Sequence, residues 1–368
     1  MSDSTLSRRE FLRDSTLATA GLAAGLAAAA NSSLFAADNP EIPKTRSYNP
    51  NMEYRRLGKT GLWISAVCLG GHWKRVDKVL PKAFDNPGWL SAGLDDPDFN
   101  KNRADVVSRC LEVGINYIDA CTTEEILTYC KALKGRRDKV FLGCSWFQGE
   151  MRFDGFRTTP ALLKTLDEGM KKNKLEVVDL WRITLHEQSG QHTQGEIEQM
   201  IKALETAKKQ GKARFVGFSS HDRPHIKKLI ETYSDIVDVV VTPYTAMSKE
   251  LPKDSLFEAI RKYNIGVFGI KPFASGSLFA GDGTPGSATE PEDHKRARMA
   301  IRNILCNPAI TAPIPGLATP AQVDNLVAAL GERRQLDVAE AQHLEQAMDH
   351  AFANLPPDYH WLRDWKYV

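Results

Sequence analysis

The run Ile64-Ser65-Ala66-Val67-Cys68-Leu69-Gly70-Gly71 contains a short apolar candidate strand at residues 67–71. Seven similar runs follow it, and a stretch with helical periodicity comes after each of the eight. The candidate strands are residues 67–71, 116–120, 140–146, 177–184, 214–220, 237–244, 266–273 and 310–316. The candidate helices are residues 105–113, 124–133, 160–172, 195–210, 224–232, 254–263, 292–305 and 320–330.

Eight alternations of strand and helix predict an α/β fold of the (β/α)8 TIM-barrel type. Strands that alternate with helices pair in parallel through right-handed crossovers, and a chain of 368 residues suits one such domain. An open, doubly wound sheet is the competing architecture. It is disfavoured because no Gly-x-Gly-x-x-Gly motif follows the first strand.

The first 37 residues are typical of an export signal. Arg8 and Arg9 precede an uncharged stretch rich in alanine and glycine at residues 18–30, which is too short and weakly apolar to anchor a transmembrane helix. Paired arginines here indicate twin-arginine export, so we expect that machinery as a partner, a periplasmic or secreted location, and no membrane anchor after cleavage. A chance Arg-Arg pair in an N-terminal helix is the alternative.

The rest of the chain divides into three expected parts. A proline-interrupted linker at residues 38–52 leads into the barrel domain at residues 53–355, and residues 356–368 form an aromatic tail. Aromatic residues also occur in the long segment at residues 72–100, after the first strand. Because loops at this strand end cover the active site of a barrel, the two segments predict a deep, aromatic-walled pocket.

Charge and cysteine usage exclude some classes of partner. Forty-eight basic and 46 acidic residues leave a net charge of +2, and no basic block is long enough to follow phosphates, so a small molecule is expected as ligand rather than nucleic acid. The six cysteines show no Cys-x-x-Cys pair, which argues against a metal cluster, although export leaves a disulfide open. The histidines and carboxylates show no metal-ligand spacing, so no catalytic metal is expected.

Five blocks of sequence resemble the aldo/keto reductase family. They occur in order over about residues 53–330: Tyr54 to Gly71, Gly114 to Asp119, Ala132 to Asp138, Val216 to Ser220, and Pro313 to Gly316. The resemblance implies a barrel of the aldo/keto reductase type and an oxidoreductase that uses NADP, with NAD as the alternative. It also implies that the dinucleotide lies extended over the C-terminal rim of the barrel.

The resemblance assigns the adenosine phosphate to the last strand–helix junction. There, the free amides at the start of a helix suit a phosphate, although ordinary helix capping explains the same residues. The residues implied at this end are Gly316, Thr319, Gln322 and Asn325. The loop after the seventh strand would hold the pyrophosphate through Lys271, Ser275 and Gly276.

The nicotinamide end departs from the family. Ser219 and Ser220 lie where the family holds the carboxamide, and the second of them replaces the usual asparagine. Val241 replaces a usual glutamine, and Ile270 replaces the tyrosine that usually stacks on the ring. The nicotinamide end is therefore less well matched than the adenosine end.

The catalytic centre departs further. The family uses an aspartate, a tyrosine, a lysine and a histidine, and only Asp119 matches, at the end of the second strand. The segment between Asp119 and Glu124 is too short to carry the tyrosine, and Ser145 and Thr184 stand at the lysine and histidine positions. Low turnover of simple aldehydes is expected without a phenol of lowered pKa.

A relocated centre is the corresponding hypothesis. Arg182 and His186 share one face of the fourth strand if that strand stays regular, and an arginine inside a barrel requires an anion, for which Asp119 is the candidate. The hypothetical set is Asp119, Arg182, His186 and Glu124. A structural ion pair with a rim histidine is the alternative, and His221 is a further rim histidine.

The predicted function is that of an exported, NADP-dependent oxidoreductase acting on a small carbonyl or sugar-like substrate. Two alternatives from other classes remain open. One is a non-catalytic binding protein that keeps the barrel, and the other is a cofactor-free lyase or isomerase at the same rim.

Overall fold

The computed structural model describes residues 39–73, 75–83, 93–248 and 255–364. The chain divides into two units, Met1–Ile42 and Pro43–Val368, and the description below concerns the second. The expected signal at residues 1–37 lies outside the described residues, as do Phe84, Trp89, Trp365 and Tyr367 of the two aromatic segments. Within the described part, no helix combines the length and apolarity that a bilayer span requires.

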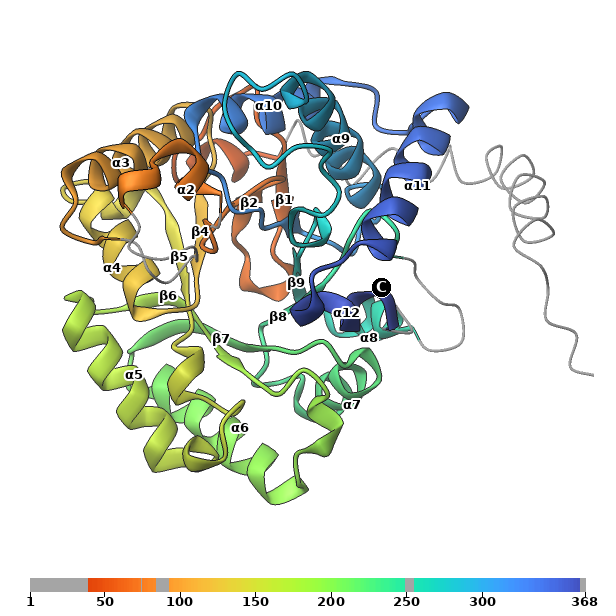
Figure 1. Ribbon diagram of the computed structural model, residues 1–368. Coiled ribbons are helices and arrows are strands. Elements are labelled where there is room, and N and C mark those ends of the chain that lie inside the picture. The colour runs from red at the N-terminus through yellow and green to blue at the C-terminus, as the bar shows by residue number, and fades with distance from the viewer. Residues whose placement is uncertain (1–38, 74, 84–92, 249–254, 365–368) are drawn as a thin grey trace, which may run out of the picture. The chain divides into compact units, whose positions relative to one another are not determined.

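Eight parallel strands form one sheet in the order β10-β9-β8-β7-β6-β5-β4-β3 (Figure 1). A parallel bridge between Gly70 and Gly316 joins the two ends of this order, and Gly70 N donates to Pro315 O at 2.8 Å, so the sheet closes into a barrel. The strands are β3 (Leu69–Gly70), β4 (Tyr117–Ala120), β5 (Phe141–Cys144), β6 (Val178–Thr184), β7 (Ala213–Ser219), β8 (Val239–Pro243), β9 (Gly266–Ile270) and β10 (Ala312–Pro313).

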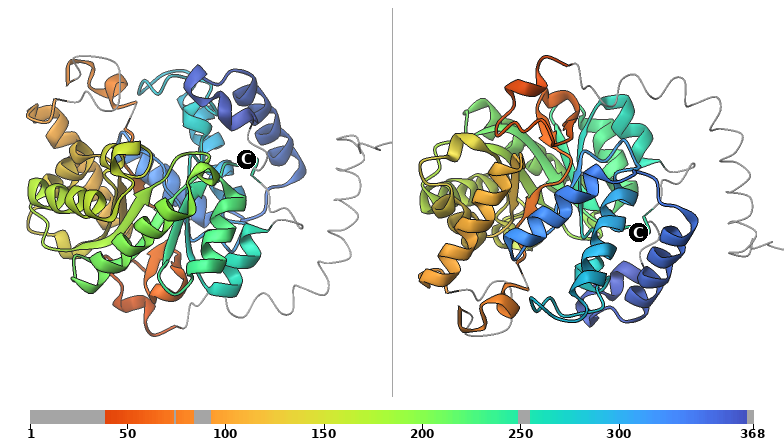
Figure 2. Two further views of the ribbon diagram at one scale, coloured as in Figure 1. Left: turned by 90° about the horizontal axis from the view of Figure 1, so that it is seen from below. Right: turned by 90° about the horizontal axis from the view of Figure 1, so that it is seen from above.

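Helices surround the strands on the outside (Figures 1 and 2). The predicted barrel is therefore confirmed, and the eight predicted strands and eight predicted helices are all present. The α-helices are α2 (Val76–Val79), α3 (Pro97–Glu112), α4 (Thr123–Ala132), α5 (Thr159–Asn173), α6 (Gln194–Lys209), α7 (Arg223–Tyr233), α8 (Leu256–Tyr263), α9 (Glu290–Ile304), α10 (Pro320–Gly331), α11 (Val338–Ala353) and α12 (His360–Asp364). Short 3-10 helices are η1 (Ile42–Lys44), η2 (Gly58–Thr60), η3 (Pro81–Ala83), η4 (Arg137–Lys139), η5 (Phe147–Gly149), η6 (Asp154–Phe156), η7 (Ser189–Gln191), η8 (Ala274–Gly276) and η9 (Pro357–Tyr359).

Capping side chains set where most of these helices begin. Thr122, Thr158 and Thr193 each accept a hydrogen bond from a backbone amide in the first turn of the helix that follows. Helix α3 begins at Pro97 and not at the predicted residue 105, because Asp96 caps it by accepting a hydrogen bond from Phe99 N at 2.7 Å. The segment at residues 72–100 is thus partly helical, since it also contains α2.

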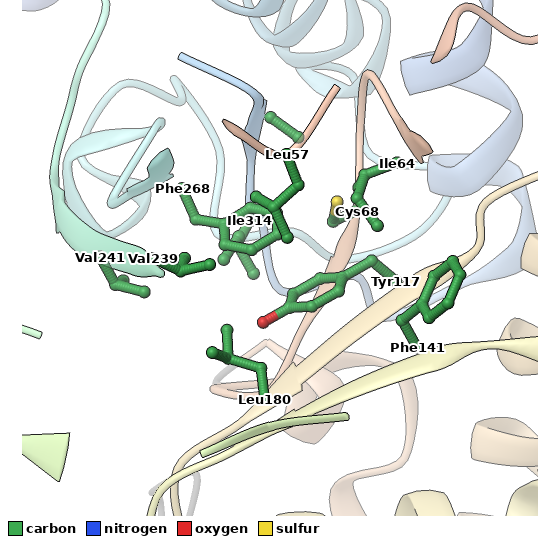
Figure 3. Packing of buried hydrophobic residues seen from close by; sticks show 11 residues of the cluster. Leu57, Ile64, Cys68, Tyr117, Phe141, Leu180, Val239, Val241, Phe268 and Ile314 are labelled. Atoms are coloured by element: carbon green, nitrogen blue, oxygen red, sulfur yellow. The ribbon is translucent and has the colours of Figure 1, made fainter. Parts of the chain in front are cut away.

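A hydrophobic cluster fills the barrel interior (Figure 3). Tyr117 and Phe268 stack in it with ring centroids 4.1 Å apart. The antiparallel hairpin of β1 (Tyr54–Arg56) and β2 (Trp63–Ser65) contributes Leu57 and Ile64, so it closes one end of the barrel. The buried members are Leu57, Ile64, Cys68, Tyr117, Phe141, Leu180, Val239, Val241, Phe268, Ala312 and Ile314. The open end is therefore the one at the C-terminal ends of the strands.

A second cluster fastens the C-terminal region to the barrel. Helix α11, which the sequence reasoning missed, packs against α9, and the tail adds Leu355 and Leu362. These apolar groups meet the loops after β8 and β9. The buried members are Ala246, Ala274, Leu278, Met299, Ala300, Leu344, Ala347, Met348, Leu355 and Leu362. This packing brings the aromatic tail next to the open end of the barrel.

Candidate active site

A cavity of about 450 Å³ opens at the C-terminal ends of the strands. Its floor includes Asp119 from β4, Arg182 and Thr184 from β6, and Ser219 from β7. Its walls come from the loops after β3, β9 and β10 and from the tail, which supplies Tyr359 and Trp361. Its size and mixed lining suit a small-molecule site. The aromatic wall that the sequence predicted consists of Trp73, Phe147, Tyr359 and Trp361.

Asp119 and Arg182 form a buried ion pair on the cavity floor. Arg182 Nε donates to Asp119 Oδ2 at 2.9 Å, and Arg182 Nη2 donates to Asp119 Oδ1. The Asp119 side chain is 5% exposed and the Arg182 side chain is 6% exposed. Burial alone would lower the pKa of Arg182, but the Asp119 carboxylate outweighs it and raises that pKa above its ordinary value. Arg182 is therefore charged, and the two hydrogen bonds hold it in place. The Tyr117 hydroxyl donates to Asp119 Oδ2 at 3.0 Å as a third partner.

A second buried carboxyl organises the positions where the family has its lysine and histidine. Glu150 accepts from Ser145 Oγ at 2.6 Å and from Thr184 N at 2.7 Å, and the two hydroxyls lie 2.7 Å apart. Burial raises the pKa of Glu150, against the hydrogen bonds that lower it. Thr184 lines the cavity but Glu150 does not. Glu150 therefore holds Thr184 in place from outside the cavity.

His186 and Glu124 do not join the set that the sequence predicted. Strand β6 ends at Thr184, so the regular alternation needed to point His186 inward stops before it. Instead, His186 N donates to His192 Nε2 at 3.2 Å and His186 Nδ1 accepts from Gln188 N at 3.2 Å. Glu124 lies in the first turn of α4 and does not line the cavity.

The neighbouring Glu125 points inward instead, and sequence reasoning missed it. Glu125 is fully buried and lines the cavity. Its Oε1 accepts from His72 N at 2.5 Å and lies 2.9 Å from His72 Nδ1, while its Oε2 accepts from Cys121 N at 2.8 Å. His72 adopts a φ of 49°, in the left-handed region that non-glycine residues seldom occupy. No periodic pattern predicts this pairing, because His72 lies in a loop.

The rim brings together seven of the nine residues implied for the cofactor. They are Ser219, Lys271, Ser275, Gly276, Gly316, Gln322 and Asn325, and all of them line the cavity. A Cβ at Gly316 would lie 2.6 Å from Gly71 O, so closure of the barrel itself requires this glycine.

Ser220 and Thr319 do not line the cavity, which corrects the prediction for both. Ser220 Oγ lies 2.7 Å from Ser189 Oγ, because alternation along the chain turns it away from Ser219. The Thr319 hydroxyl accepts from Gln322 N at 3.2 Å and caps α10, as in the capping alternative.

Two charged residues outside the predicted set hold the loop after β9, which lines the cavity. Arg75 donates to Gly276 O at 2.9 Å and to Gly281 O at 3.0 Å. From the other side, Asp293 Oδ1 accepts from Ala280 N at 2.6 Å. Side chains distant in sequence thus hold the backbone of residues 276–281, which sequence patterns do not reveal.

A buried arginine fixes the start of α10 in the same manner. Arg103, from α3, is fully buried and donates to Leu317 O at 2.7 Å and to Ala318 O at 2.9 Å. Ala318 N in turn donates to Gln322 Oε1 at 2.8 Å. The turn that the family uses for the adenosine phosphate is therefore preorganised by the protein.

The tail supplies a stacked wall of the cavity. The rings of His221 and Trp361 lie 4.2 Å apart with an interplanar angle of 19°. Burial lowers the pKa of His221 well below its ordinary value, so this histidine is neutral. Lys271 Nζ lies 5.2 Å from the centre of the Tyr359 ring. The six cysteines are all free thiols.

Comparison with known proteins agrees with this architecture. The model of the aldo/keto reductase family matches residues 91–349, so the chain belongs to the aldo/keto reductase family. L-glyceraldehyde 3-phosphate reductase of Escherichia coli strain K12 is 26% identical over 242 residues, which cover 62% of this chain and only 63% of that protein. L-galactose dehydrogenase of Arabidopsis thaliana is 22% identical over 310 residues, which cover 77% of this chain and 90% of that protein.

Among solved structures, an aldo-keto reductase from Bacillus halodurans in its holo form matches with a TM-score of 0.58 at 19% identity. The match covers 80% of this chain and 96% of that one. At this identity the likeness shows the fold and not the activity.

Proposed function

We propose that the protein is an NAD(P)H-dependent reductase of small, polyhydroxylated carbonyl compounds whose catalytic centre is rearranged. The observation that carries this proposal is the buried Asp119–Arg182 pair on the cavity floor, which aims a fixed cation at the space where a carbonyl oxygen would bind. Asp119 occupies Nε and Nη2 of Arg182, so Nη1 is the nitrogen available to a substrate oxygen. A preorganised cation stabilises the negative charge that develops on that oxygen.

The rim residues fit a nicotinamide dinucleotide. Lys271 and the N-terminus of α10 offer positive charge to phosphates, and Ser219 and Ser275 offer hydroxyls. When bound, the reduced cofactor supplies a hydride to the carbonyl carbon, which with one proton on the oxygen gives an alcohol and the oxidised cofactor. The protein binds and orients the two reactants and must supply the proton.

The cavity lining supports a polar, sugar-like substrate. Arg152 and Glu187 form an ion pair at 3.2 Å on its wall, and Asp358 also lines it, so several hydroxyl groups can find partners. Trp361 and Phe147 offer apolar faces to the carbon skeleton of such a molecule. The names of the two relatives, which refer to a triose phosphate and to galactose, point to the same class of compound.

Calorimetric titration of the purified protein with NADPH and NADH tests the cofactor. We expect binding, and we expect Gln322→Ala combined with Asn325→Ala to weaken it at least tenfold, or by about 1.4 kcal/mol. Asp324→Ala is the matched control, because Asp324 lies on the same helix but pairs with Arg109 outside the cavity. Transfer of deuterium from 4-deuterated cofactor to the alcohol product, followed by mass spectrometry with glyceraldehyde as the probe, tests the reaction.

A titration without heat at millimolar NADPH and NADH would overturn the proposal and favour the binding-protein or cofactor-free alternatives. Binding of the dinucleotide without deuterium transfer would show that the protein binds the cofactor but does not reduce this class of carbonyl compound. The melting temperature of the double variant, compared with that of Asp324→Ala, separates lost binding from lost folding.

We also propose that the protein is exported folded by the twin-arginine route. The support is the Arg8-Arg9 pair followed by the uncharged stretch at residues 18–30. Changing both arginines to lysine is expected to leave uncleaved precursor in the cytoplasm, as measured by immunoblotting of cell fractions. Changing Arg13 to lysine is the control, and normal processing of the double variant would contradict the twin-arginine proposal.

A further inference from the structure

We propose that His72, oriented by Glu125, donates the proton to the carbonyl oxygen in place of the missing tyrosine. This inference rests on the proposed reductase function and names the residue that completes its chemistry. His72 follows β3 and lines the same cavity as Asp119 and Arg182, which lie at the ends of β4 and β6. The candidate donor and the candidate oxyanion site therefore face one space.

Glu125 determines which nitrogen of His72 can act. Burial alone would raise the pKa of Glu125, but the imidazole and the two backbone amides outweigh burial and lower that pKa below its ordinary value. An ionised carboxylate only accepts hydrogen bonds, so His72 Nδ1 is the donor across the 2.9 Å contact. Because Nδ1 keeps its proton against Glu125, the doubly protonated imidazolium is the form that carries a proton on Nε2, and that is the proton that can pass to a substrate.

The contacts of Glu125 make the pair rigid. Its two oxygens bind the amides of His72 and Cys121, which belong to two neighbouring strand ends. The carboxylate thus fixes the backbone of the donor as well as its ring. The His72 side chain is 39% exposed while that of Glu125 is 0% exposed, so the ring reaches the cavity and its partner stays shielded from water.

The other proton carriers of the cavity are placed less well. Burial raises the pKa of the Cys121 thiol well above its ordinary value, so it holds its proton tightly. His221 is buried, neutral and covered by the Trp361 ring. Among the described lining residues Tyr359 is the one phenol, and its ring lies in the tail, 5.2 Å from Lys271 Nζ.

His72, Cys121 and Glu125 also lie close enough to be considered as a metal site, with one ligand atom of each within 4.8 Å of the others. Their orientation favours the hydrogen-bonded pair. Cys121 Sγ lies 3.8 Å from Nδ1 and 3.9 Å from Nε2. Both Glu125 oxygens accept from backbone amides, and Oε1 also accepts from His72 Nδ1. A metal bound by Nδ1 would have to displace this last contact.

The reaction moves one proton from the imidazolium form of His72 to the substrate oxygen. The N–H bond at Nε2 breaks and leaves its electron pair on nitrogen, which gives the neutral imidazole with its proton on Nδ1, and a new O–H bond forms on the substrate oxygen. The two electrons of the reduction arrive with the hydride from the nicotinamide cofactor, which is oxidised. Solvent at the cavity mouth then returns a proton to Nε2.

Kinetics of three variants test the donor, with NADPH and glyceraldehyde as probes. His72→Ala is expected to lower kcat by about 10²- to 10⁴-fold, the usual range for losing a general acid, with the Kd for NADPH within twofold of the original. Added imidazole should restore part of the rate, because the truncated side chain leaves room for it. His186→Ala is the matched control and is expected to keep kcat within about twofold, and Tyr359→Phe tests the competing phenol.

A second measurement does not depend on activity. Nitrogen-15 spectra of the histidine rings, assigned by comparison with His72→Gln, are expected to show a proton on Nδ1 of His72 in the original protein. Glu125→Gln should abolish this preference for Nδ1 and lower kcat at least tenfold. The adjacent Glu124→Gln should change neither.

The outcomes separate the two proposals. Unchanged kcat in His72→Ala, loss of rate in Tyr359→Phe, or an unprotonated Nδ1 would overturn the role of His72 while the reductase function stands. Stoichiometric zinc, measured by plasma emission spectrometry and lost in His72→Ala, would also overturn it in favour of a metal site. Failure of the original protein to bind dinucleotide would overturn the reductase function itself.

Discussion

Replacing Arg182 with methionine is expected to destabilise the protein by about 3–5 kcal/mol, because it leaves the Asp119 carboxylate buried without its cation. Among the described residues, Asp119 then keeps the Tyr117 hydroxyl as its side-chain partner, and a hydroxyl cannot neutralise the charge. Reduction of glyceraldehyde should fall to background as well, since the group that faces the substrate oxygen is lost. Urea unfolding followed by circular dichroism measures the first effect, and the rate of NADPH oxidation measures the second.

The double variant Asp119→Asn with Arg182→Met separates these two effects. Removing both charges leaves neither one unpaired, so at least half of the lost stability should return while the activity stays absent. Arg152→Met is the matched control, because its ion pair with Glu187 lies on the same cavity but is 27% and 39% exposed. That variant should cost about 0–1 kcal/mol. A cost below 1 kcal/mol for Arg182→Met would show that Asp119 does not need this cation.

Replacing Asp179 with asparagine is expected to cost about 2–4 kcal/mol at neutral pH. Asp179 is nearly buried at the start of β6, and its carboxylate binds Arg46 at 3.2 Å, Arg137 at 2.7 Å and Arg214 at 2.8 Å. It also accepts from Leu142 N at 3.0 Å. The amide can keep the backbone contact, but it leaves three neighbouring guanidinium groups without their shared anion. Asp105→Asn, at an exposed pair with Lys101, is the control.

The loss should depend on pH in a defined direction. Burial would raise the pKa of Asp179, but Arg137, the Leu142 amide and Arg46 outweigh it and lower that pKa below its ordinary value. Stability from a carboxyl with a lowered folded-state pKa is fully present above its unfolded pKa, about 3.9, and is lost as the pH falls through the folded value. The difference between the original protein and Asp179→Asn should therefore be constant near neutrality and shrink below about pH 4. A difference that grows on acidification would contradict this assignment.

The prediction made from alternation along β6 agreed with the structure as far as the end of that strand. Alternation along β6 correctly paired Arg182 with Asp119, because side chains of a strand point to opposite faces in turn. The same rule was wrong for His186, two residues beyond the end of the strand. Glu124 was predicted to face the site, but the neighbouring Glu125 lines the cavity instead, because successive helical positions differ by about 100°.

The sequence by itself determined the barrel, the family and the charged pair on the cavity floor. The barrel and the charged pair depend on periodicity, which backbone geometry imposes inside each strand or helix, and the family depends on the five blocks that resemble it. The tertiary structure alone decided the pairing of His72 with Glu125, the anchoring of the rim loop by Arg75, and the position of the aromatic tail. Each of these involves a loop or terminus, where the backbone has no repeating geometry and the direction of a side chain depends on partners far away in the chain.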